Sequence, residues 1–150
     1  MTAIDGTGAD RLFSAAQVNY RQLEYYAGNT LNRGIELYRK KDYGAAAQAF
    51  KSSIALAPAA SYAAEAAKML AGIYVTMGET ERAIESLRSF VELRPSSDAA
   101  RVRLGELYYS EGRYDEALAQ YEKAVELNPD AGNRYALGQV YLQAGDFSRA

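Results

Sequence analysis

Apolar residues recur along this chain at steps of three and four positions, the spacing of one face of an α-helix. Pairs of the form Leu-x-x-x-Tyr or Ala-x-x-x-Leu/aromatic carry this pattern: Ala46/Phe50, Leu70/Tyr74, Ala83/Leu87, Leu104/Tyr108, Ala117/Tyr121 and Leu137/Tyr141. Upstream, a similar seam comprises Phe13, Ala16, Tyr20, Leu23 and Ala27. The pattern predicts helix throughout from about Asp10.

The helical segments repeat with a fixed period. Three phrases end in proline and read Ile54-Ala-Leu-Ala-Pro58, Val91-Glu-Leu-Arg-Pro95 and Val125-Glu-Leu-Asn-Pro129. The second and third prolines lie about 34 residues apart, and the series Tyr74, Tyr108, Tyr141 and Gly78, Gly112, Gly145 keep nearly the same spacing. A fixed period of this size in an apolar, alanine-rich sequence indicates stacked helical hairpins rather than one globular core.

These landmarks resemble the tetratricopeptide repeat (TPR), which places Leu-Gly and then Tyr on a first helix, with Ala, an aromatic or Leu, Ala and a terminal Pro on and after a second. The resemblance implies an all-α, right-handed superhelical solenoid of helix-turn-helix repeats. Repeats are expected at about 27–60, 64–97 and 98–130, with a truncated fourth at 131–150. The TPR domain would thus span 27–150, preceded by a flexible tail at 1–9 and an extra helix at 10–26.

Two departures from the period predict local adjustments. Lys41 stands where later repeats have Gly, at a helix C-terminus that favours a left-handed residue. About three extra residues near positions 60–63 lengthen the second repeat, where Ser61 is placed to cap a longer helix. Neither departure is expected to end the array.

The helix expected at 10–26 has two interpretations. It caps the first repeat, or its apolar seam binds another chain and the helix continues into the first repeat through Gly28 and Asn29. The other end of the array also invites a contact. Ala150 falls early in the second helix of repeat four, so Phe147 and its neighbours would lack their covering helix. We therefore expect a piece of a longer array, or a dimer or concentration-dependent oligomer.

Composition removes several kinds of chemistry. The chain contains no Cys and no His, which excludes disulfides, thiolate nucleophiles, thiolate metal sites and imidazole chemistry. No phosphate-binding glycine loop is present. We accordingly expect no enzyme activity, no catalytic residues, no metal site and no cofactor.

Charge and hydropathy limit the classes of partner that the chain is expected to bind. The formal net charge of −2 gives no overall attraction to nucleic acid or anionic lipid. No stretch approaches the ~20 apolar residues of a membrane span, and the N-terminus lacks the basic and apolar regions of a secretory signal. A cytoplasmic location is expected, although the absence of Cys is equally compatible with the periplasm.

The resemblance also implies a concave groove lined by the first helices of successive repeats. Transferred by repeat position, the partner-binding residues are Leu31, Ile35, Tyr38, Lys68, Val75, Arg103, Glu106, Tyr109, Tyr135 and Gln139. The terminal-carboxylate clamp found in some family members is not expected. Its polar positions hold Leu31, Ile35 and Met69 here, and only Arg103 matches.

Two functions remain. The favoured one is a non-catalytic protein-protein interaction module that binds a peptide or helix with apolar anchors in the groove. The alternative is a self-assembling scaffold, or the repeat region of a longer protein whose catalytic or signalling domain lies beyond residue 150.

Overall fold

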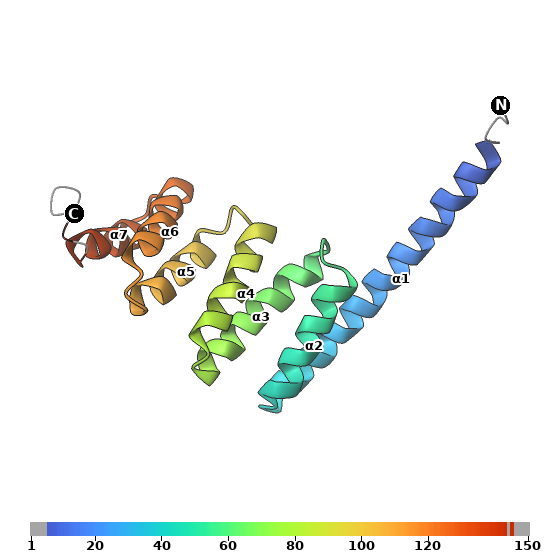
Figure 1. The fold of residues 1–150 in the computed structure, drawn as a ribbon, viewed down its shortest axis with the longest axis horizontal. Coiled ribbons are helices and arrows are strands. Elements are labelled where there is room, and N and C mark those ends of the chain that lie inside the picture. Colours follow the sequence, from blue (N-terminus) through green and yellow to red (C-terminus); the bar gives the residue numbers. More distant parts are fainter. Residues whose placement is uncertain (1–5, 144, 146–150) are drawn as a thin grey trace. The chain divides into compact units, whose positions relative to one another are not determined.

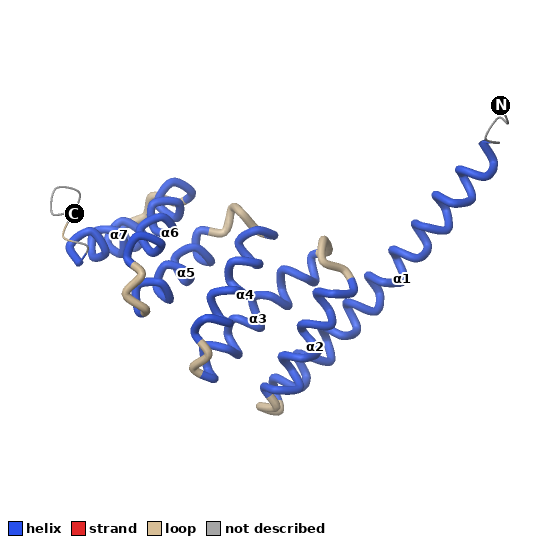
Figure 2. The backbone as a smooth tube through the Cα atoms, viewed as in Figure 1, coloured by secondary structure: helices blue, strands red, loops and turns tan. Residues whose placement is uncertain are grey.

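The chain folds as a series of α-helices joined by short turns. A computed structural model describes residues 6–143 and Gly145, and of residues 6–16 and 18 it describes the backbone alone. Its helices are α1 (Gly6–Arg39), α2 (Tyr43–Leu56), α3 (Ser61–Met77), α4 (Thr80–Leu93), α5 (Asp98–Ser110), α6 (Tyr114–Leu127) and α7 (Ala131–Gln143). Figure 2 shows helix and loop only in this part of the chain, which confirms the all-α helical-repeat prediction.

The helices form two compact units, residues 1–66 and 67–150, and the boundary falls within α3. In the first unit, α2 packs against the C-terminal half of α1 (Figure 1). The Phe50 ring is fully buried there and lies over Gly34, where the added Cβ of an alanine would approach Phe50 Cε1 to 2.6 Å. The buried Ser53 hydroxyl donates to the Ala27 carbonyl at 2.8 Å and ties the end of α2 to the middle of α1.

Helix α1 corrects two expected boundaries. Helical backbone extends back to Gly6, although a tail was expected over 1–9. The helix also runs unbroken through Gly28 and Asn29 to Arg39, so residues 10–26 are not a separate helix. The Tyr62 ring lies 3.4 Å from the position of a Cβ on Gly28, so this glycine makes room for an aromatic ring while remaining helical.

In the second unit, apolar side chains of successive helices form one core. Its members include Ile84, Leu87, Leu104, Tyr108, Tyr121 and Val140. Tyrosines at the repeated position of the first helices are buried, which explains why this position is aromatic in consecutive repeats. Helix α5 packs against α4 and α6, and α6 packs against α7.

The turns between helices follow the predicted landmarks. Lys41 has a φ of 63°, and Gly78, Gly112 and Gly145 have φ values of 73°, 72° and 80°. The extra residues near 60–63 lengthen α3, which begins at Ser61 and has 17 residues against 13 in α5. Of the described helices, none is long and apolar enough to cross a membrane.

Candidate protein-binding groove

A groove of about 710 Å³ lies in the second unit beside the N-terminal half of α5. Its walls come from α3, α4, α5 and the start of α7. Eleven residues line it: Lys68, Phe90, Ser97, Asp98, Ala99, Ala100, Val102, Arg103, Glu106, Asp130 and Asn133. The groove therefore combines an apolar surface with a charged region and an amide–carboxylate region.

Phe90 and Val102 supply the larger apolar side chains of the groove. Both are half-buried and pack against the core of the second unit, so their exposed parts are held on a rigid base. Phe90 belongs to α4 and Val102 to α5, which places apolar groups on two neighbouring helices. Such a surface can accept an aliphatic or aromatic side chain of a partner.

The charged region of the groove contains an ion pair between Arg103 and Glu106. Arg103 Nη1 contacts Glu106 Oε2 at 3.2 Å, and both side chains are largely exposed. An exposed pair of this kind contributes little to folding, so its members can exchange partners with a bound segment at small cost. Lys68 of α3 lines the same groove.

The amide–carboxylate region joins the starts of α5 and α7. Asn128 Nδ2 donates to Asp98 Oδ2 at 2.7 Å, and Asn133 Nδ2 donates to the Asn128 carbonyl at 2.8 Å. Asp130 caps α7 because its Oδ1 accepts from the Asn133 backbone N–H at 2.7 Å. The hydrogen bond from Asn128 is the largest cause that lowers the pKa of Asp98 below 3.8, so this carboxylate is anionic at neutral pH.

Three of the predicted binding residues meet in this groove: Lys68, Arg103 and Glu106. Tyr38 and Tyr109 do not line it. Their rings pack instead on the first residue of the second helix in their own hairpins, with centroids 5.6 Å from Tyr43 and 5.5 Å from Tyr114. Both are half-buried, so part of each ring remains at the surface.

The other predicted residues lie outside the groove. Leu31 is only 7% exposed, so its assignment to a binding surface is wrong; it belongs to the face of α1 that packs against α2. Ile35 is half-buried, and Val75 of α3 is exposed. On α7, Gln139 Nε2 donates to the Tyr135 hydroxyl at 2.7 Å, and both residues are exposed.

Sequence reasoning missed five polar or aromatic lining residues: Phe90, Ser97, Asp98, Asp130 and Asn133. The sequence did contain one signal for two of these residues. Asp130 precedes α7 and is followed three positions later by Asn133, a spacing typical of an N-cap and its first-turn partner. The contact between Asn128 and Asp98 spans 30 positions and carries no local signature.

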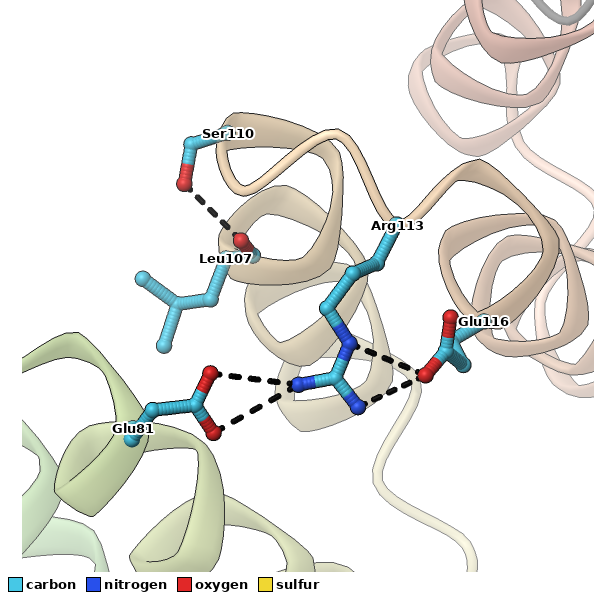
Figure 3. Close-up of polar contacts among 5 residues, drawn as sticks. All are labelled: Glu81, Leu107, Ser110, Arg113 and Glu116. Atoms are coloured by element: carbon cyan, nitrogen blue, oxygen red, sulfur yellow. Dashed lines mark hydrogen bonds and ion pairs between the residues drawn. The ribbon is translucent and has the colours of Figure 1, made fainter.

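Arg113 holds α4 close to the start of α6, within the second unit. Its guanidinium donates to Glu116 Oε1 at 2.6 and 2.9 Å and reaches the carboxylate of Glu81 on α4 at 3.3 Å (Figure 3). The same group lies over the Tyr108 ring, 4.6 Å from its centroid. The hydrogen bond to Glu116 is the largest cause that raises the pKa of Arg113. Arg113 thus links α4 to the α5–α6 hairpin.

In the part of the chain that the structure describes, no cluster of three or more acidic residues, Cys or His is placed to hold a metal ion. The groove offers contacts for an apolar side chain, for ionic groups and for hydrogen-bonding backbone.

Comparisons with known proteins agree with this architecture. A family model described as a tetratricopeptide repeat matches residues 68–132, which include the whole groove except Asn133. The small glutamine-rich tetratricopeptide repeat-containing protein 2 of Mycosarcoma maydis is 36% identical over 97 residues, covering 64% of this chain and 26% of that protein. The photosystem I assembly protein Ycf3 of Synechococcus sp. strain CC9605 is 27% identical over 135 residues, covering 81% of this chain and 77% of that protein. This chain thus spans about a quarter of the first relative.

Solved structures show the same fold. The crystal structure of MamA protein has a TM-score of 0.71 at 27% identity, covering 83% of this chain and 67% of that chain. The first TPR of Spaghetti (RPAP3), bound to the HSP90 peptide SRMEEVD, has a TM-score of 0.66 and covers 81% of this chain and 95% of that chain. Its identity of 18% makes this second likeness one of fold alone.

Proposed function

Since this chain is a tetratricopeptide repeat protein, we propose that it is a non-catalytic interaction module which binds a segment of a partner protein in the groove beside α5. The observation that carries the proposal is the groove itself. It brings Lys68, Arg103 and Glu106 from two first helices next to the apolar groups of Phe90 and Val102. Ionic groups beside apolar ones suit a peptide with an apolar anchor and flanking charges.

The similar proteins support a role in protein-protein interaction. One relative, Ycf3, is a photosystem I assembly protein, and one protein of the same fold was solved with a peptide bound. The binding mode proposed for this chain differs from a carboxylate clamp. Leu31 is buried and Ile35 is half-buried, so two positions that are polar in that clamp hold apolar side chains here. Arg103, at a position that does match the clamp, contacts Glu106.

Selection of peptides from a random display library on the purified chain tests the proposal. Binders should lose at least about tenfold in affinity, or ~1.4 kcal/mol, when Val102→Glu or Arg103→Ala alters the groove. Arg88→Ala is the matched control, because it removes an exposed arginine of α4 outside the groove. Fluorescence anisotropy measures affinity, and circular dichroism checks that the variants remain helical.

Two outcomes would reject this function. Failure to select any peptide would show that the groove does not accept short segments. Selected peptides that bind both groove variants as tightly as the wild type would place the binding surface elsewhere on the chain.

A further inference from the structure

Helix α1 is much longer than the helix that covers it. It has 34 residues and α2 has 14, so about 20 residues of α1 have no counterpart in α2. At 1.5 Å per residue, these 20 residues make roughly 30 Å of helix. Figure 1 shows the N-terminal part of α1 extending past α2. We call residues 6–26 the α1 arm. The Ser53–Ala27 hydrogen bond marks the level along α1 that α2 reaches.

The α1 arm exposes large apolar side chains. Tyr20 is 48% exposed, Leu23 39%, Tyr25 66% and Tyr26 52%. Aromatic residues are enriched in protein interfaces, and neighbouring exposed apolar side chains mark an interaction surface. A lone helix of this length is only marginally stable in water, and Gly6, Gly8 and Asn19 are poor helix formers. A contact that covers the arm would supply the missing stabilisation.

One face of the arm continues an interface that the structure already contains. Ala27, Leu31 and Gly34 of α1 are buried: Ala27 packs with Leu56 at the end of α2 and with Ala57 and Ala60 just after it, and Gly34 lies under Phe50 of α2. Steps of three and four residues lead from them back to Leu23 and Tyr20, which therefore occupy the same face of the helix. In the sequence, the same steps reach Ala16 and Phe13. The arm thus extends a helix-packing face beyond the end of its covering helix.

We infer that this face pairs with the same face of a second copy of the chain, with the two α1 arms antiparallel. In such a pair, large side chains of one arm are set against small ones of the other. An antiparallel register centred near residue 18 sets position 20 against position 16 of the second copy, so a tyrosine meets an alanine twice around the two-fold axis. The same register sets position 23 against position 13, and Leu meets Phe.

Charge is also compatible with self-pairing. The arm carries Asp10, Arg11, Arg21 and Glu24, whose charges cancel, so two arms have no net repulsion. In the register centred near residue 18, Asp10 is set against position 26 and Glu24 against position 12. Both opposing positions are uncharged, Tyr26 and Leu12. No like charges are brought together along the seam.

Sedimentation of the full chain tests the dimer. Tyr20→Glu and Leu23→Glu should each raise the dimer dissociation constant by at least about tenfold, because each places a charge in the apolar contact. Tyr25→Glu is the matched control: it lies about 140° around the helix from Tyr20 and is also an exposed tyrosine. We expect it to change the dissociation constant by less than about twofold.

Crosslinking tests the antiparallel register, and the natural absence of Cys makes it unambiguous. A mixture of Ala16→Cys and Tyr20→Cys chains should form a disulfide-linked dimer, whereas Leu23→Cys alone should not, since its two copies would lie ~15 Å apart along the helix axis. Efficient self-crosslinking of Leu23→Cys would show parallel arms and overturn the proposed register.

The dimer itself is rejected by any of three results. A monomer at about 100 μM would show that no second copy covers the arm. Equal weakening by Tyr20→Glu and Tyr25→Glu would point to loss of helix rather than to one face. A dimer unaffected by Tyr20→Glu and Leu23→Glu would have to form through another surface.

Discussion

A residue with positive φ ends the first helix of the first three repeats. The Lys41 N–H donates to the Tyr38 carbonyl at 2.9 Å, and the Gly112 N–H donates to the Tyr109 carbonyl at 3.0 Å, so both turns use the same hydrogen bond. Glycine adopts this conformation without a steric penalty, but Lys41 has a φ of 63° and a Cβ. The alignment of repeats predicted this mismatch, and the backbone confirms it.

Lys41→Gly should therefore stabilise the chain. Relief of the left-handed strain is expected to raise the free energy of unfolding by about 1 kcal/mol. Lys40→Gly is the matched control, because it removes the neighbouring lysine at a position without positive φ and should be neutral or destabilising. Urea unfolding measures both. A Lys41→Gly variant no more stable than Lys40→Gly would contradict the strain argument.

Two helical glycines should respond oppositely to alanine. A Cβ on Gly105 would lie 2.9 Å from Cε2 of the buried Tyr121 ring, whereas a Cβ on Gly72 has nothing within 4 Å. Gly72→Ala should stabilise the chain by roughly 0.5–1 kcal/mol through helix propensity. Gly105→Ala should destabilise it by about 1–3 kcal/mol through overpacking.

Thermal and urea unfolding of these two variants and the wild type measure the change in stability that each alanine causes. Burial raises the pKa of Tyr121 to about 12, so its hydroxyl stays neutral and the clash does not vary between pH 6 and about 9. If Gly105→Ala were as stable as Gly72→Ala, the α5–α6 contact would have to be looser than the structure has it.

At the scale of elements, the apolar periodicity predicted which segments are helical. It did not predict which residues of α1 are covered by other parts of the chain. Gly28 lies in the interior of α1, where glycine costs about 1 kcal/mol against alanine. Helix α1 continues because the Tyr62 ring packs over Gly28, and Tyr62 belongs to the extra residues of the second repeat. A tertiary contact from an insertion overrides the local preference, and a repeat pattern does not show it.

The candidate groove was predictable to a similar extent. Helical register placed Lys68, Arg103 and Glu106 on one face, and all three line the groove. It misplaced Leu31, since register does not show how far a hairpin partner covers a helix. It missed Asp98 because that residue contributes through amide contacts to a loop and to the next helix, which depend on geometry between repeats.

The stability that the hydrogen bonds between the starts of α5 and α7 contribute should depend on pH. Hydrogen bonds from Asn128, and less from Asn133, lower the pKa of Asp98, so the folded state favours its anionic form. A lowered pKa contributes stability that is complete above the unfolded value of 3.8 and is lost as the pH falls towards the folded value. Asp98→Ala should therefore be less stable than the wild type between pH 5 and about 8, and this difference should shrink below about pH 4.

Thermal unfolding across this pH range measures the effect, and hydrogen exchange should show its largest increase at the start of α7. Glu92→Ala, which removes an exposed carboxylate of α4, serves as control. A stability difference that persists unchanged at pH 3 would show that Asp98 acts through packing rather than through its charge.

At the scale of the whole molecule, helices α1, α2 and α4 to α7 pack mainly on neighbours in sequence. Helix α1 contacts α2, α5 contacts α4 and α6, and α6 contacts α7. Repeat arrays of this kind gain stability from individual hairpins and from adjacent interfaces, so damage can remain local. The sequence predicted one TPR domain over 27–150, while contacts divide the chain into residues 1–66 and 67–150. A period of repeats shows that hairpins stack, but not how strongly each neighbouring pair is coupled.

Phe50→Ala should therefore unfold the two units unequally. Phe50 is fully buried in the first unit, and its removal is expected to cost about 3–5 kcal/mol there, because Gly34 beneath it has no side chain to fill the cavity. Hydrogen exchange followed by mass spectrometry should show protection lost in α2 and in residues 27–39, with α5 and α6 much less affected. Tyr121→Ala is the reciprocal variant, since it removes a buried ring from the second unit. Equal loss of protection throughout the chain in both variants would mean that the two units unfold as a single cooperative structure.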